Sequence, residues 1–377
     1  MRMSRSWNAA VVAVLTAGGL ALGAASPAAT AQAGGRRVRT AGAAPAGPGA
    51  RLPVPGGLDG VAARSPGSAW AVGQTSSDST ASDRPILAHW NGTAWRTVTS
   101  PALPSRGGLN AVATFRGGGW AVGQAGVRVG GGVPRLLIVR LAGTAVRRVP
   151  VPGPADGELF GVAATSAANA WAVGFTGLDR PLILRWNGTA WNRARLPSSV
   201  GLGVFTAVAA TSRMNAWAVL NPARQPGRAR IVRWNGRRWG QVVSPAIGAS
   251  YRLFGVAAIS ARNAWAVGFT GSGRTVILHW DGLRWNPVPS PDGFLLAVSG
   301  SSADNAWAVG VTASGTRALA LHWNGRSWKQ ATTPDSGLHS HLGGVSFIPP
   351  SRHAWAVGNT APPVATLILQ WNGTAWH

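Results

Sequence analysis

The tetrapeptide Trp-Ala-Val-Gly recurs throughout the chain after residue 60. Six copies are identical, and a seventh reads Trp-Ala-Val-Leu. The copies are spaced 42 to 51 residues apart and begin at Trp70, Trp120, Trp171, Trp217, Trp265, Trp307 and Trp355. Repetition at this period indicates a stack or ring of similar supersecondary units, because one such unit cannot bury its apolar face alone.

Each repeat has the pattern of four short strands. In the third repeat the expected strands cover 159–166, 170–176, 181–186 and 189–197. The third strand ends in Trp-Asn-Gly or Trp-Asp-Gly in six of the seven repeats, and a second Trp follows. Nineteen of the 20 Trp occupy these repeat positions, so we interpret them as core residues. The second repeat departs from the pattern, with Leu141 and Val146 in place of the two hairpin Trp, and we expect the weakest packing there.

The hexapeptide Trp-Asn-Gly-Thr-Ala-Trp occurs at 90–95, 186–191 and 371–376. Asn-Gly between β-forming residues favours a two-residue hairpin turn in which both residues have positive φ. With Asn187 and Gly188 as that turn, Leu184 would oppose Trp191. Trp186 and Trp191 would then be diagonal neighbours on one face of the sheet.

These features predict an all-β fold, a seven-bladed β-propeller of four-stranded antiparallel blades. The expected blades cover 58–101, 109–152, 159–197, 205–245, 253–291, 295–334 and 342–377. A linear solenoid is the alternative, but neither end shows a polar capping repeat. The segment 51–57, Arg-Leu-Pro-Val-Pro-Gly-Gly, resembles the end of a fourth strand, whereas the last repeat has barely begun its own. We therefore expect 51–57 to supply the outer strand of the last blade and to close the ring.

The composition excludes several classes of chemistry. Among 377 residues there is no Cys, so disulfides, thiolate metal sites and cysteine catalysis are excluded. The chain has 35 cationic and only 10 acidic residues, a net charge of +25. Such an excess favours an anionic partner.

Residues 1–33 have the pattern of a secretory signal peptide. Two Arg precede an uncharged apolar run, and Ala31-Gln32-Ala33 fits a cleavage site. An uncleaved membrane anchor is the alternative, although the run is short and rich in Ala and Gly. Residues 34–50 read as a flexible Gly/Ala/Pro/Arg linker. We expect a secreted, monomeric protein with no membrane span after cleavage.

The repeat resembles that of kelch-type propellers, because a Trp-Ala-Val-Gly strand is followed by an aromatic-ended strand, a turn and a Trp. It is also similar to actinobacterial secreted proteins built from Trp-Ala-Val-Gly and His-Trp-Asn-Gly-Thr-x-Trp repeats, mostly of unassigned function. Tectonin-type lectins are a more distant resemblance. The resemblance covers roughly 51–377 and implies a propeller, but it implies no activity. The kelch-like copper oxidases need a Cys-linked Tyr, and this chain has no Cys and only Tyr251.

Function is expected in the variable loops. The connections between strands two and three, and between blades, differ in length and sequence from repeat to repeat, which is typical of binding loops on a rigid scaffold. An Arg recurs in six of the seven two-to-three connections: Arg84, Arg135, Arg180, Arg228, Arg274 and Arg317. A ring would gather these six into a cationic crown, suited to an anionic cell-envelope polymer, a glycan or a secreted protein. Several acids, including Asp156 and Glu158, belong to the same face.

Three further hypotheses stay open. A carbohydrate-active hydrolase or lyase would use loop carboxylates such as Asp156 and Glu158. A purely scaffolding propeller would bind another secreted protein. His339, His341 and Asp335 are a weak candidate for a zinc site, and otherwise no metal or cofactor is expected. A His or Arg also precedes the hairpin Trp in six repeats, on separate blades, and we interpret these residues as polar strand residues.

Overall fold

The computed structural model describes residues 50–76, 83–126, 134–143, 145–224, 226–334, 339–362 and 364–377. The chain divides into two units, Met1–Gly47 and Pro48–His377, and every described residue belongs to the second. The predicted signal peptide, most of the linker and Asp335 lie outside the described residues. Within the described ranges, no helix is long and apolar enough for a membrane crossing.

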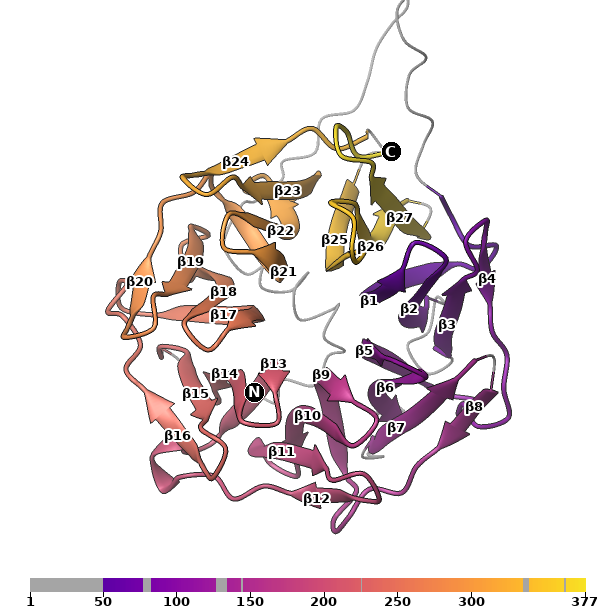
Figure 1. Ribbon diagram of the computed structural model, residues 1–377, viewed down its shortest axis with the longest axis horizontal. Coiled ribbons are helices and arrows are strands. Elements are labelled where there is room, and N and C mark those ends of the chain that lie inside the picture. The colour runs from indigo at the N-terminus through magenta and orange to yellow at the C-terminus, as the bar shows by residue number, and fades with distance from the viewer. Residues whose placement is uncertain are drawn as a thin grey trace, which may run out of the picture. The chain divides into compact units, whose positions relative to one another are not determined.

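The second unit is a seven-bladed β-propeller, as predicted (Figure 1). Six sheets have four antiparallel strands and the last has three, each in sequence order. The strands of blades 1–3 are β1 Gly56–Ser65, β2 Ser68–Thr75, β3 Pro85–Trp90, β4 Trp95–Thr97; β5 Gly107–Phe115, β6 Gly118–Ala125, β7 Arg135–Ala142, β8 Ala145–Arg148; and β9 Gly157–Ser166, β10 Asn169–Thr176, β11 Arg180–Trp186, β12 Trp191–Arg193. Those of blades 4 and 5 are β13 Gly203–Ser212, β14 Asn215–Pro222, β15 Arg230–Trp234, β16 Trp239–Val242; and β17 Tyr251–Ser260, β18 Asn263–Thr270, β19 Thr275–Trp280, β20 Trp285–Pro287.

Blades 6 and 7 contain β21 Gly293–Ser302, β22 Asn305–Thr312, β23 Ala318–Trp323, β24 Trp328–Ala331; and β25 His339–Phe347, β26 Ala354–Ala361, β27 Ala365–Trp371. A 3-10 turn, η2 Ser198–Val200, joins blades 3 and 4. The first strand of each blade lies beside the first strand of the next, and β25 lies beside β1. The ring is therefore closed, which excludes the solenoid.

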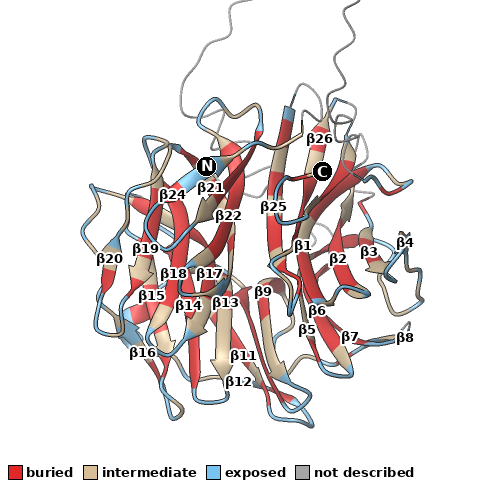
Figure 2. Ribbon diagram, turned by 45° about the horizontal axis from the view of Figure 1, so that its top comes forward, coloured by how far each residue is buried: buried red, intermediate tan, exposed pale blue. Residues whose placement is uncertain are grey.

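The second strand of each blade is the most buried part of the fold (Figure 2). In β10 every residue from Asn169 to Thr176 is buried. A Cβ on Gly174 would lie 2.0 Å from the carbonyl oxygen of Glu158, so the repeated Gly lets the first and second strands approach. Large and small side chains thus alternate across the blades, which gives dense packing between neighbouring sheets.

The hairpin between the third and fourth strands differs from the predicted two-residue turn. Trp186 directly opposes Trp191, and Leu184 opposes Arg193. The Asn187 side chain replaces a tight backbone turn, because its Oδ1 accepts hydrogen bonds from the backbone N–H of Thr189 at 3.0 Å and of Ala190 at 2.9 Å. Only Gly188 has a positive φ here. The predicted register was wrong because it assumed a two-residue backbone turn. The hydrogen bonds to the Asn187 side chain stabilise a longer turn instead.

Each hairpin Trp pair packs on the second-strand Trp of the preceding blade. In the six resulting clusters, the ring centroid of the second-strand Trp lies 4.8–5.2 Å from those of the two hairpin Trp. The clusters are Trp355–Trp90–Trp95, Trp120–Trp186–Trp191, Trp171–Trp234–Trp239, Trp217–Trp280–Trp285, Trp265–Trp323–Trp328 and Trp307–Trp371–Trp376. At the seventh interface, Trp70 belongs to a core cluster with Leu141 and Val146 instead. Aromatic packing therefore joins the blades at every interface except that between blades 1 and 2.

The outer edge of the last blade receives both ends of the described chain. Trp376 pairs with Trp371, and His377 exchanges backbone hydrogen bonds with Gln370. Further along β27, the N–H of Ile368 donates to the carbonyl oxygen of Ala50 at 3.0 Å. The Leu52 N–H donates to Thr366 Oγ1, and the Leu52 side chain is buried. The closing contacts thus come from Ala50 and Leu52, whereas Gly56 and Gly57, which we placed in the closing strand, begin β1.

Candidate functional site

The two ends of the ring carry different connections. The turns between strands one and two touch the turns between strands three and four: a Cβ on Gly188 would lie 3.4 Å from the Ala168 side chain. We name this end the turn face. The connections between strands two and three meet the connections between blades at the other end, where the Gly203 N–H donates to the Asp179 carbonyl oxygen. We name that end the loop face.

All six predicted crown Arg lie on the loop face with exposed side chains: Arg84, Arg135, Arg180, Arg228, Arg274 and Arg317. Three of their backbone N–H groups donate to the Thr that ends the preceding second strand, Arg84 to Thr75 Oγ1 at 2.9 Å, for example. Their main chain is therefore held while their side chains are exposed, and in the crown the Arg228 Nε–H also donates to the Gly248 carbonyl oxygen at 3.2 Å. The crown residues come from six blades, so they encircle the loop face and do not converge on one point.

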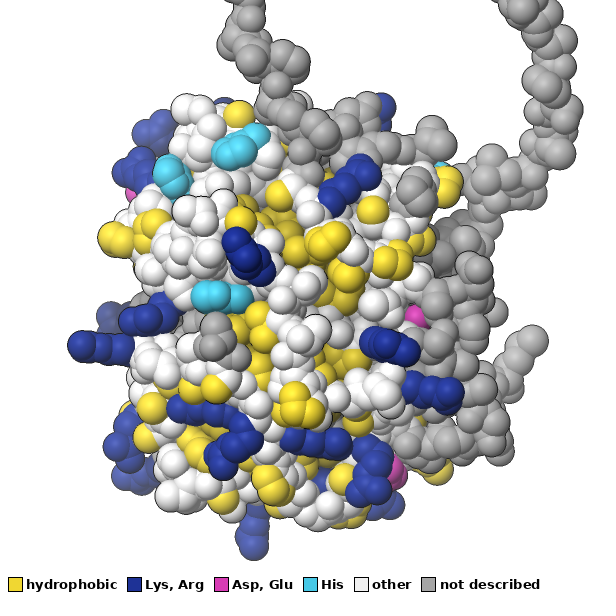
Figure 3. Space-filling view, turned by 90° about the vertical axis from the view of Figure 1, so that its right-hand side faces the viewer, with side chains coloured by type: hydrophobic (Ala, Val, Ile, Leu, Met, Phe, Trp, Pro, Cys, Tyr) yellow, Lys and Arg dark blue, Asp and Glu magenta, His cyan; other side chains and the backbone are white. Residues whose placement is uncertain are grey.

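Acidic residues share the loop face, as the sequence indicated. Asp83 and Glu158 are buried, and Asp156, Asp179 and Asp292 lie in connections of the same end. Glu158 Oε1 accepts a hydrogen bond from Asn110 Nδ2 at 2.9 Å, between neighbouring first strands. The side of the ring that Figure 3 shows also has far more Lys and Arg than Asp and Glu on its surface.

Blade-specific side chains that were not predicted from the sequence lie where the first strands reach the loop face. Phe254, Phe269 and Phe294 form a contiguous aromatic group, with ring centroids 4.7 and 5.0 Å apart. Arg252, also on β17, has a lowered pKa because it is buried. A usable signal existed: these positions vary between repeats that are otherwise nearly identical.

The His or Arg before the hairpin Trp has a structural role. His89, His279 and His322 pack on the second-strand Trp of their own blades, with ring centroids 4.3–4.6 Å apart. Arg140, Arg185 and Arg233 place their guanidinium groups 4.6–5.0 Å from the equivalent Trp rings. Burial lowers the pKa of all three His. These side chains cover the Trp rings from separate blades, and cation–π attraction adds to the packing where the residue is Arg.

The weak zinc candidate gains no support. His339 and His341 lie two residues apart on β25, and His339 is exposed. Burial lowers the pKa of His341 to about 4. No group of three or more potential metal ligands exists among the described residues, which do not include Asp335.

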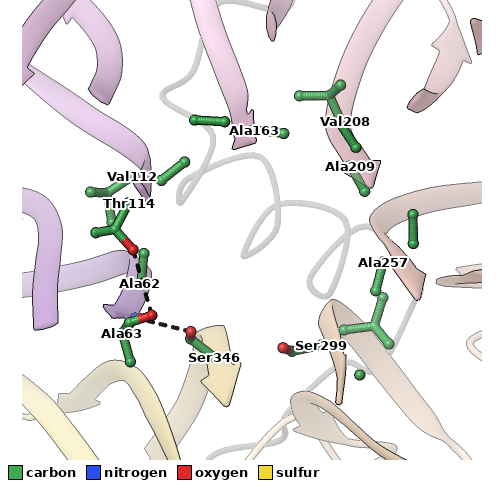
Figure 4. A pocket seen from close by; sticks show the side chains of 16 residues that line it. Ala62, Ala63, Val112, Thr114, Ala163, Val208, Ala209, Ala257, Ser299 and Ser346 are labelled. Atoms are coloured by element: carbon green, nitrogen blue, oxygen red, sulfur yellow. Dashed lines mark hydrogen bonds between the residues drawn. The ribbon is translucent and has the colours of Figure 1, made fainter. Parts of the chain in front are cut away.

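A cavity of about 280 Å³ occupies the central channel near the turn face (Figure 4). Its walls are mainly Ala and Val from the first strands, with Thr114, Ser299 and Ser346 as polar residues. Ser346 Oγ accepts a hydrogen bond from the Ala63 N–H, which ties blade 7 to blade 1. Among the residues that the structure describes, no ionisable side chain lines this cavity, so these walls supply no acid, base or charged ligand.

No protein-family model matches the chain, and no curated protein matches its sequence. Solved structures do resemble it. YCF48 bound to D1 peptide has 15% identity and a TM-score of 0.58, over 84% of this chain and 95% of that one. The GH74 xyloglucanase from Xanthomonas campestris has 14% identity and a TM-score of 0.58, over 85% of this chain but only 53% of the enzyme. The fucose-specific lectin from Aleuria aurantia has 12% identity and a TM-score of 0.51, over 88% and 96%.

At these identities the similarity demonstrates the propeller fold alone. The similar structures include proteins that bind a peptide or fucose and an enzyme that acts on a polysaccharide, so the fold is compatible with binding and with catalysis.

Proposed function

We propose that this chain is a secreted, non-catalytic propeller that binds an anionic polymer of the cell envelope on its loop face. The observation that carries the proposal is the crown: exposed Arg side chains from six blades at one end of a rigid ring. Secretion rests on the signal-peptide pattern of residues 1–33. The resemblance to secreted Trp-Ala-Val-Gly repeat proteins agrees with this proposal.

The geometry supports an extended ligand better than a small one. The crown Arg are distributed around the ring, and each guanidinium can form paired hydrogen bonds with a carboxylate or phosphate. A chain with regularly spaced anions could contact several of them at once, and such multivalent contacts add up to useful affinity although each exposed pair is weak. The acids on the same face would help to select the spacing of the ligand charges.

The test is binding of the purified protein to isolated cell walls and to teichoic acid, at low and near-physiological salt. We expect binding that weakens steeply with salt, and weakens further when Arg84, Arg180, Arg228 and Arg274 are changed to Gln. Wall binding by this variant that equals wild type would contradict the proposal. Release of sugar fragments from the walls, abolished by Glu158→Gln, would instead support the enzyme hypothesis.

A further inference from the structure

The turn face, where we expected no ligand, carries a large excess of positive charge. Nine exposed Arg lie in or beside its turns: Arg64, Arg116, Arg213, Arg237, Arg238, Arg262, Arg284, Arg326 and Arg352. Of the eight acids in the described ranges, only Asp281 and Asp304 belong to these turns, whereas five lie on the loop face.

The charge is concentrated on part of the ring. Seven of the nine Arg belong to blades 4–7, whereas both turns of blade 3 contain none. Arg213, Arg237, Arg238 and Arg262 form the densest part of this arc, on the adjacent blades 4 and 5. Arg213 also lies close enough to Arg185 to help lower the pKa of Arg185, after burial as the first cause. Asp304 lies near Arg352, in another part of the arc. Asp281 lies in the hairpin turn of blade 5, where a Cβ on the next residue, Gly282, would lie 3.2 Å from the Arg262 side chain.

The turns that carry these Arg are held rigidly. The Trp234 indole N–H donates to the Arg213 carbonyl oxygen at 3.1 Å, and the Trp280 indole N–H donates to the Ala261 carbonyl oxygen at 3.2 Å. The Asn235 Oδ1 accepts hydrogen bonds from the backbone N–H groups of Arg237 and Arg238, both at 3.0 Å. The backbone of each Arg is thus fixed before any ligand arrives, which lowers the entropy lost on binding.

We propose that this arc, which we call the turn-face arc, is a second binding site, for a linear phosphate polymer. It is independent of the crown and faces the opposite direction. The planar guanidinium group of Arg can donate two hydrogen bonds to the oxygens of one phosphate. The Arg of the arc follow one another along the ring and do not enclose a pocket, which suits a linear ligand. The hairpin Trp of blades 4 and 5 are buried and engaged with the turns, so they offer no stacking platform for bases. Recognition therefore concerns the phosphates alone.

Two sites on opposite faces have a consequence for function. A rigid ring that holds one anionic chain on each end can bridge two chains. The protein would then act as a cross-link between polymers, in addition to binding them.

The experiment measures binding of long-chain inorganic polyphosphate to the purified full chain and to three variants. The turn-face variant changes Arg213, Arg237, Arg238 and Arg262 to Gln. The matched control removes the same charge from exposed residues of the fourth strands, Arg96, Arg147, Arg148 and Lys329. The crown variant changes Arg84, Arg180, Arg228 and Arg274 to Gln. Circular dichroism and the melting temperature show whether each variant is folded.

We expect the turn-face variant to bind polyphosphate at least about tenfold more weakly, with a shallower dependence of log Kd on log salt concentration, while the control stays within about twofold. The crown variant should retain this polyphosphate site. Poly(glycerol phosphate) and single-stranded DNA should show the same dependence on the four turn-face Arg, because both present phosphodiesters.

Three results would overturn the proposal. Equal losses in the turn-face variant and the control would mean that net charge alone drives binding. Unchanged binding by the turn-face variant would exclude the arc. Loss in the crown variant alone would also reject the arc, yet leave the proposed function standing. A different pattern would reject the proposed function and keep this site. In that pattern the crown variant binds cell walls like wild type, and the turn-face variant loses polyphosphate binding.

Discussion

Trp355 in the last blade packs against Trp90 in the first, with ring centroids 5.1 Å apart. The two residues are far apart in sequence, yet their contact is the same as that between consecutive blades elsewhere in the ring. Trp355 is buried, and Trp95 completes the cluster from the other side, edge-on to Trp355. Closure of the ring therefore uses the ordinary interface between blades, and its stability should depend on the same aromatic contacts.

Replacement of Trp355 by Ala should destabilise the protein by about 3–5 kcal/mol, because it leaves a large cavity between blades 7 and 1. Trp70→Ala is the matched comparison, since Trp70 faces Leu141 and Val146 and lacks the hairpin Trp pair. We expect a smaller loss there. Urea unfolding monitored by circular dichroism would measure both, and equal losses would show that the aromatic clusters contribute no more than ordinary burial.

Removal of the N-terminal closing contacts should also destabilise the ring. A chain that begins at Gly56 loses the hydrogen bond between Ile368 and Ala50 and the buried Leu52 side chain. Leu52→Ala alone should cost about 2–3 kcal/mol of unfolding free energy. A chain that begins at Pro48 retains both contacts and should melt at the wild-type temperature. If both truncated chains melt alike, Ala50 and Leu52 have no role in closure.

The carboxylate of Asp281 should make stability depend on pH. It replaces the turn Asn in blade 5, and the backbone N–H groups of Arg284 and Leu283 lower its pKa from 3.8 to about 2. As the pH falls below 3.8, the unfolded chain takes up the proton first, so this contribution is lost progressively towards pH 2.

Asp281→Asn keeps a side-chain acceptor but removes the titration. We expect the melting temperature of wild type to fall more than that of the variant between pH 4 and pH 2. The difference between the two proteins, recorded by calorimetry across that range, isolates Asp281 from the other acids. Parallel curves would show that the hydrogen bonds to Asp281 do not favour its charged form.

Much of the fold was predictable because one pattern repeats. The spacing of the Trp-Ala-Val-Gly copies predicted seven units, and the short apolar runs predicted four strands in each. The Trp positions predicted the core, because a large aromatic residue that recurs at the same position of every repeat is expected to be buried. The hairpin register was not predictable, because Asn187 can stabilise a turn either through its own backbone conformation or through its side-chain oxygen.

The candidate site was also partly predictable from the sequence. The sequence by itself determined the blades, their order and which connections lie at the same end, because antiparallel neighbours must alternate in direction. It also identified the six crown Arg. Only the tertiary structure decided which blade covers each Trp and how Ala50 and Trp376 share one sheet edge. These relationships join residues from different repeats, and nothing local in the chain specifies a contact that exists only after the ring has closed.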